Sequence, residues 1–137
     1  MKQHTTNYQN AFIEVAEDTP AIEGEIPPVK DDKKTVANIQ FEMLSKHPYK
    51  FTSDDVLFHV YAERKDLTEG ELEKAREDFF SRGQACLRAS PLTKRYGWGI
   101  HHDKEGKIAM YGYGTDQYKK FATDKTLKVV KAMKSGK

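Results

Sequence analysis

Hydrophobic residues in the first half of the chain recur every three or four positions, which is the period of an α-helix. One such stripe follows Thr35, a residue that can cap a helix N-terminus. Two more follow the Thr52-Ser53-Asp54-Asp55 run and the Thr68-x-x-Glu71 capping box. The pattern therefore predicts helices over residues 35–46, 53–65 and 69–82.

A β-hairpin is predicted in the second half of the chain. Residues 96–102 and 107–113 flank Asp103-Lys104-Glu105-Gly106, where Asp suits the start of a turn and Gly suits a positive φ. A four-residue turn places Trp98 opposite Tyr111, and a bulge at Gly106 shifts this pairing by one residue. The alternating stretch at residues 11–17 predicts a further short strand.

The remaining segments complete an α+β pattern. They are a proline-containing loop at 19–34, a short strand at 84–89, one helical turn after Ser90-Pro91, and helices at 116–121 and 124–133. We expect a small antiparallel sheet built on the hairpin, with three to five helices in a single layer on one face. The 137 residues fit one domain, with frayed ends at 1–10 and 135–137.

Charge is distributed unevenly along the chain. Residues 1–83 carry 11 Lys and Arg against 17 Asp and Glu, whereas residues 84–137 carry 12 against 4. The basic second half predicts either a surface for phosphate or nucleic acid, or a face that packs against the acidic first half. The polar start and the lack of a long apolar run lead us to expect a cytosolic protein without a membrane segment.

A basic cluster surrounds the helix start at Ser90-Pro91. Free backbone N–H groups beside guanidinium forks suit a carboxylate or phosphate, so the leading hypothesis is a small anion- or partner-binding domain. The candidate ligand-binding residues are Arg88, Ser90, Lys94, Arg95 and Trp98. The alternative is that the arginines pair with carboxylates such as Asp54 or Asp55.

The second hypothesis is a small enzyme that uses Cys86 or His101 in the same cleft. A Cys86 thiolate activated by Arg88 would act as nucleophile and His101 as base. The alternative is a small buried cysteine and a hydrogen-bonded core histidine. A lone cysteine excludes an internal disulfide, and the adjacent His101 and His102 point to opposite faces of a strand, so we predict neither a metal site nor a cofactor.

A third hypothesis is a nucleic-acid-associated protein that uses the basic C-terminal half. The lysines concerned are Lys119, Lys120, Lys125, Lys128, Lys131 and Lys134. Tyr113, Tyr118 and Phe121 lie among them and would stack on bases while the lysines contact phosphates. A solvated helix face explains the same run of lysines.

Several long motifs resemble an uncharacterised family of short bacterial and fungal proteins. They are HTTNYQNAFIEVAED, KKTVANIQFEM, PYKFTSDDVLFHVYAERK, FFSRGQACLRASPLTKRYGWGIH and EGKIAMY. Ala85 stands where that family usually has proline, and Thr19-Pro20 stands where it often has Cys-Pro, which weakens any two-cysteine redox role. The resemblance implies no activity, so no catalytic residue is carried over from it.

Overall fold

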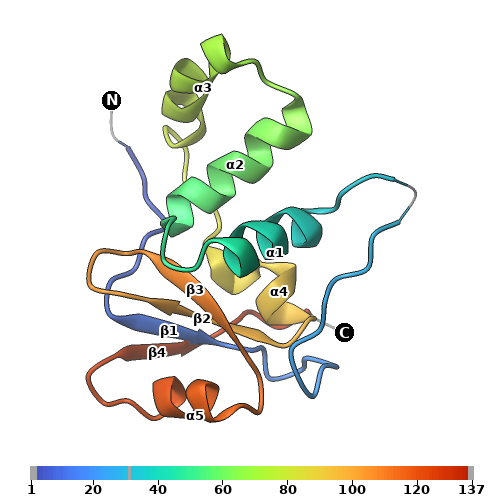
Figure 1. Ribbon diagram of the computed structural model, residues 1–137. Helices are drawn as coiled ribbons and strands as arrows, with labels where there is room; N and C mark the ends of the chain where they lie inside the picture. Colours follow the sequence, from blue (N-terminus) through green and yellow to red (C-terminus); the bar gives the residue numbers. More distant parts are fainter. Residues whose placement is uncertain (1–2, 31, 136–137) are drawn as a thin grey trace.

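The computed structural model describes residues 3–30 and 32–135, and a mixed sheet forms its centre (Figure 1). The strands are β1 (Ala11–Glu14), β2 (Trp98–His102), β3 (Ile108–Gly112) and β4 (Lys128–Lys131), in the spatial order β3-β2-β1-β4. β1 pairs antiparallel with β2, and β2 pairs antiparallel with β3, whereas β1 and β4 run parallel. The α+β class with a mostly antiparallel sheet is therefore confirmed.

The helical elements lie between β1 and β2 and between β3 and β4. They are α1 (Val36–Lys46), α2 (Ser53–Lys65), α3 (Leu72–Phe79), α4 (Pro91–Lys94) and α5 (Asp116–Ala122), with 3-10 turns η1 (Glu69–Glu71) and η2 (Leu87–Ala89). The helix predicted over 69–82 is thus a 3-10 turn followed by a shorter α-helix. The strand predicted at 84–89 is wrong, because residues 87–89 form η2.

Capping explains why α1 and α2 begin where the sequence predicts. The Thr35 hydroxyl accepts a hydrogen bond from the Asn38 backbone N–H, and the Asn38 side chain accepts one from the Thr35 N–H. Thr52 and Asp55 repeat this reciprocal arrangement at the start of α2. Each box satisfies backbone donors that a helix N-terminus leaves without intrahelical partners.

The N-terminal segment, expected to fray, is bound to α2 over its described part. The Asp54 carboxylate accepts hydrogen bonds from the Thr5 hydroxyl (2.6 Å) and from the Thr6 backbone N–H (2.7 Å). The Asn7 side chain accepts from the Asp54 backbone N–H (2.9 Å). These contacts hold Thr5–Asn7 against the start of α2. Residues 1–2 and 136–137, also expected to fray, lie outside the described residues.

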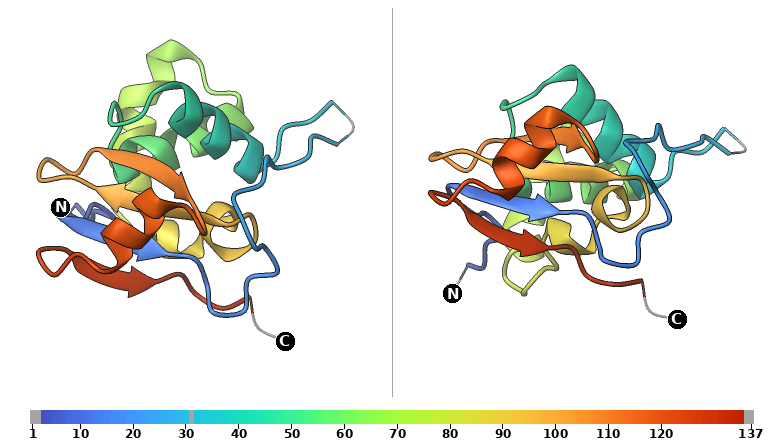
Figure 2. Two further views of the ribbon diagram at one scale, coloured as in Figure 1. Left: turned by 60° about the horizontal axis from the view of Figure 1, so that its bottom comes forward. Right: turned by 90° about the horizontal axis from the view of Figure 1, so that it is seen from below.

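The sheet has helices on both faces (Figure 2). On one face Ile13, Ile100 and Ile108 are fully buried in the main core, which also contains residues of α1, α2 and α4. On the other face Phe12 and Val15 pack against Tyr118 of α5. The expected single helical layer therefore describes the first face, and α5 adds a second, smaller layer.

The hairpin pairing is shifted by one residue from the four-residue-turn register. Trp98 lies opposite Gly112, and Gly99 lies opposite Tyr111. Gly106 has φ +83°, as the turn pattern requires. A Cβ added to Gly99 would lie 2.5 Å from the Phe12 ring and 2.7 Å from the Tyr118 ring. Packing of α5 against the sheet therefore occupies the space above this glycine.

The C-terminal helix predicted at 124–133 is wrong. Residues 128–131 (KVVK) form β4, which pairs with β1 so that Phe12 lies beside Val129 and Ile13 beside Val130. Both valines are β-branched and suit a strand, and pairing with β1 decides between strand and helix. The two ends of the chain are thus joined in one sheet.

Candidate functional site

The structure divides the basic cluster that the sequence predicts around Ser90. Arg88 turns toward the outer edge of β4, where its Nε donates a hydrogen bond to the Lys131 carbonyl (2.6 Å). The Arg88 carbonyl accepts from the Met133 backbone N–H (2.8 Å). These bonds cover part of an exposed sheet edge, so Arg88 has a structural role away from the other candidates.

Ser90 is buried and acts as the cap of α4. Its hydroxyl donates to the side-chain oxygen of Gln40 and accepts from the Leu92 backbone N–H (3.1 Å). The Trp98 side chain also has a partner within the protein, because its indole N–H donates a hydrogen bond to the Glu25 carbonyl (2.8 Å). Its ring lies against Gly24 and Phe41, which ties the 19–34 loop to the hairpin.

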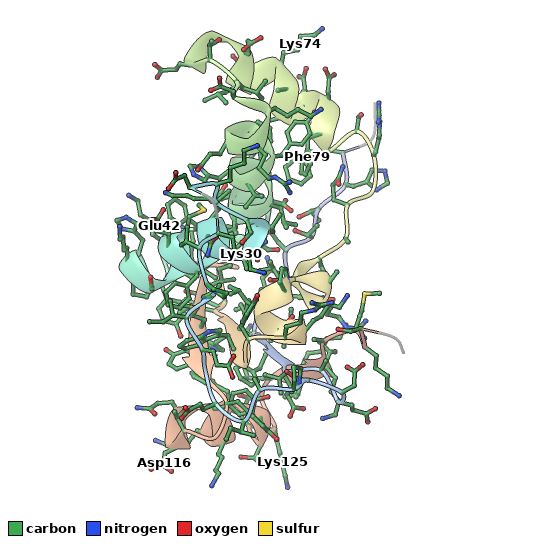
Figure 3. The ribbon with its side chains drawn as sticks, turned by 90° about the vertical axis from the view of Figure 1, so that its right-hand side faces the viewer. Lys30, Glu42, Lys74, Phe79, Asp116 and Lys125 are labelled. Atoms are coloured by element: carbon green, nitrogen blue, oxygen red, sulfur yellow. The ribbon has the colours of Figure 1, made fainter. Side chains whose placement is uncertain are left out.

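Lys94 and Arg95 lie in a groove of about 630 Å³ between the 28–37 segment, the C-terminal end of α2 and α4. Lys30, Lys33 and Lys34 contribute from the loop before α1, and Arg64 contributes from α2. We call this the basic groove. Lys30, labelled in Figure 3, lies beside α1 and far from Lys125 at the α5 end of the molecule.

The lining of the basic groove is strongly cationic. Six Lys or Arg side chains line it, and among the lining residues that the structure describes there is no Asp or Glu. Lys34 pairs with Glu42 of α1 at 2.9 Å, and this hydrogen bond raises the pKa of Lys34 and lowers that of Glu42. The cap residue Thr35 and the first two residues of α1, Val36 and Ala37, also line the groove, which adds the positive end of a helix dipole.

Four of these cations were missed by the sequence reasoning. Lys30, Lys33, Lys34 and Arg64 belong to a segment interpreted as a proline-containing loop and to a helix interpreted as structural. The available signal was the three lysines of the mixed-charge KDDKK segment at 30–34, which directly precedes the predicted helix start at Thr35. Sequence alone offers no reason to place that run against Lys94 and Arg95, which follow about sixty residues later.

Cys86 is half-buried, and its thiol lies 3.5 Å from the Tyr8 hydroxyl. This contact with Cys86 and burial both raise the pKa of Tyr8. The Tyr8 ring in turn packs edge-on against the imidazole of His102, with centroids 5.3 Å apart. The cysteine therefore lies on the main-core side of the sheet.

His101 points to the other face and so does not share a cleft with Cys86. Its Nδ1 is 2.8 Å from the Tyr49 hydroxyl, and its ring stacks on Phe121 with centroids 4.1 Å apart. Burial lowers the pKa of His101, while the carboxylates of Asp103 and Asp124 act in the opposite direction. The structure thus places the two candidate catalytic residues, Cys86 and His101, on different faces of the sheet.

His102 is fully buried, and within the described part of the chain neither of its ring nitrogens has a hydrogen-bond partner. Burial lowers its pKa to about 4, so the imidazole is neutral at neutral pH. The carbonyls of Ile100 and Ala11 offset part of this shift without reaching hydrogen-bond geometry. The sequence reasoning treated His102 only as half of an adjacent histidine pair.

Two further features concern metals and membranes. Over residues 3–30 and 32–135, no group of three or more His, Cys, Asp or Glu side chains is arranged to hold a metal ion. None of the helices in this same part of the chain is long and apolar enough to cross a bilayer.

These features define a small α+β domain with a basic groove between the 28–37 segment, the C-terminal end of α2, and α4. A family model described as a family of unknown function (DUF6157) matches residues 3–137, so the chain belongs to that family. This confirms the resemblance to a family without an assigned function. No curated protein and no solved structure matches the chain.

Proposed function

We propose that this protein is a binding domain for a small polyanionic molecule, such as one that carries phosphate groups, and that the ligand occupies the basic groove. The observation that carries the proposal is the convergence of six cations from three separate segments on one groove. A groove of about 630 Å³ falls within the range of roughly 300–1,000 Å³ typical of small-molecule sites.

Electrostatics supports an anion with more than one charge. Grouping cations is unfavourable without a counter-charge, and the described lining residues include no Asp or Glu. Outside this lining, Glu42 pairs with Lys34, Glu63 also acts on Lys34, and Asp32 directly precedes Lys33 in the chain. Arg64 and Arg95 offer planar donor forks that suit phosphate or carboxylate oxygens, and the lysines act as point charges. A diphosphate engages several of these groups at once.

The test measures binding of inorganic pyrophosphate by calorimetry and by the rise in melting temperature. A ligand that binds the folded state at one hundred times its Kd stabilises it by about 2.7 kcal/mol. We expect the double variant Lys94→Ala, Arg95→Ala to weaken binding by about tenfold or more, because each charge-assisted hydrogen bond is worth about 1.5–3 kcal/mol.

The matched control removes the same charge at the opposite end of the molecule. Lys119→Ala with Lys125→Ala deletes two exposed cations near α5 and leaves the groove unchanged. The proposal requires that this control bind pyrophosphate like the wild type. Equal weakening in both double variants would show a general charge effect, and absence of saturable binding at low salt would remove the proposed function.

The two alternative functions have less structural support. The enzyme hypothesis uses Cys86 or His101, and because the two lie on different sides of the sheet, the version in which His101 is the base for a Cys86 thiolate has no support. For a nucleic-acid surface on the C-terminal half, Lys131 and Lys134 already lie near Glu14 and Glu17, at 3.8 and 3.4 Å. Salt-sensitive binding of single-stranded RNA that the control double variant abolishes would favour this surface over the groove.

A further inference from the structure

A second polar cluster lies on the α5 face of the sheet, apart from the basic groove. The Tyr49 hydroxyl is within 2.8 Å of His101 Nδ1 and within 2.8 Å of the Tyr111 hydroxyl. The three side chains come from the loop after α1, from β2 and from β3. Together they form a continuous hydrogen-bonded chain from a half-buried imidazole to Tyr111.

Tyr111 brings this chain to an open groove of about 510 Å³. The other lining residues are Gln117, Lys120, Phe121 and Asp124. We call this the α5 groove. The Tyr111 side chain can therefore contact a ligand bound in this groove, whereas His101 is not among the lining residues.

The loop after α1 is built so that Tyr49 reaches this face. The Tyr49 backbone N–H donates to the Ile108 carbonyl (2.8 Å), and the Ile108 N–H donates to the Phe51 carbonyl (2.9 Å). The loop thus runs along the edge of β3 while Phe51 packs on the main core. Tyr49 itself has φ +61°, an unfavourable backbone conformation for a residue other than glycine.

Phe121 provides a flat aromatic surface in the α5 groove. Its ring stacks on His101 (centroids 4.1 Å apart, planes at 21°) and on Phe12 (5.4 Å, 26°). Those two residues are neighbours across β1 and β2, so they cover the sheet-facing side of the Phe121 ring. The Tyr111 ring is tilted against it, with centroids 4.8 Å apart and planes at 52°.

We propose that the α5 groove binds a small planar ligand that bears an acidic hydroxyl group, and that Tyr111, Tyr49 and His101 relay its proton. The ligand hydroxyl gives its proton to the Tyr111 oxygen, Tyr111 passes its own proton to Tyr49, and Tyr49 passes its own to His101 Nδ1. The products are a ligand anion and an imidazolium, and both tyrosines end neutral.

Each product has a counter-charge close at hand. The Lys120 ammonium lines the groove in which the ligand anion forms. The carboxylates of Asp103 and Asp124 act on the imidazole and offset part of the lowering of the His101 pKa that burial causes. Each end of the relay therefore has an opposite charge nearby, although Asp124 also lines the groove and opposes the ligand anion there.

4-Nitrophenol is a suitable probe because it is planar and because its anion absorbs visible light. At a mildly acidic pH, where the free probe is mostly protonated, we expect binding to raise the phenolate absorbance. The His101 ring should take up a proton at the same time, which a shift of its imidazole nitrogen resonances in NMR would record. Binding itself is measured by calorimetry.

Two variants interrupt the relay at different points. Tyr49→Phe removes the central hydroxyl, and His101→Asn keeps an amide near the Nδ1 position that forms a hydrogen bond without taking up a proton. We expect both to bind the probe and to lose the absorbance gain. Tyr113→Phe is the control, because this exposed tyrosine packs against Tyr118 outside the relay.

Three results would overturn the proposal. They are the absence of saturable probe binding to the wild-type protein, binding without any absorbance gain or His101 protonation, and an undiminished gain in either relay variant. If Tyr49→Phe fails to fold, His101→Asn decides the question by itself. None of these outcomes depends on pyrophosphate binding in the basic groove.

Discussion

The buried imidazole of His102 predicts that this protein loses stability at mildly acidic pH. The side chain is fully buried without a hydrogen-bond partner among the described residues, and its pKa falls to about 4. In the unfolded chain the same group titrates near the ordinary value of 6.5. Between these two values the unfolded state binds more protons than the folded state.

The sign and size of the effect follow from proton linkage. The unfolded state gains the extra proton as the pH falls. The contribution of His102 to the free energy of unfolding is therefore complete above about pH 6.5 and is lost as the pH falls toward about 4. Each unit of pKa difference corresponds to about 1.4 kcal/mol. His102 alone therefore removes about 3 kcal/mol across this window, a large part of the stability of roughly 5–15 kcal/mol typical of a small domain.

Urea unfolding at several pH values between 7 and 4.5 measures this contribution, and His102→Leu isolates it. The variant keeps the side chain apolar and removes the titrating group. At pH 7 we expect the variant to match or exceed the wild type, because two unpartnered buried nitrogens are removed. Toward pH 4.5 the wild type should lose about 2–3 kcal/mol more than the variant.

The difference between the two proteins is the decisive quantity. The other ionisable groups are present in both proteins, so their contributions largely cancel. His101 is the exception, because its charge acts on His102 and so forms part of the measured difference. Parallel pH profiles for the wild type and His102→Leu would refute the reasoning. A strong loss of stability in the variant at pH 7 would show instead that the imidazole makes a favourable interaction in the core.

Two further stability predictions concern the N-terminal segment and α5. Asp54→Asn should lower the free energy of unfolding by about 1–3 kcal/mol in urea titrations, because one amide oxygen replaces a carboxylate that accepts from Thr5 and Thr6. Gly99→Ala should cost about 1–3 kcal/mol in thermal melts, since its Cβ meets two buried rings. Gly70→Ala, with no atom within 4 Å of its Cβ, is the matched control, and an equal cost there would contradict the packing argument.

Several helix and turn boundaries could be predicted because they depend on neighbouring residues. The caps at Thr35 and Thr52 and the left-handed conformation of Gly106 are decided within a few positions of the chain. The same local reasoning failed at residues 128–131. Those residues suit a helix by spacing, but they gain more by pairing with β1 at the other end of the chain.

The candidate site could be predicted only in part, for a similar reason. Lys94 and Arg95 were assigned to an anion site from the helix start beside them, and they do line the basic groove. Arg88 was assigned to it as well, yet its guanidinium covers the edge of β4. Whether a basic side chain joins a groove or an edge depends on which segment packs beside it.

The sequence by itself determined the α+β class, the helix starts and the hairpin, because short-range hydrogen bonds and the period of apolar residues decide them. Tertiary structure alone brought the loop lysines to Lys94 and Arg95, joined Tyr49 to His101 and Tyr111, and buried His102 without a partner. These arrangements depend on contacts between segments far apart in the chain, and no local pattern encodes which distant segments will meet.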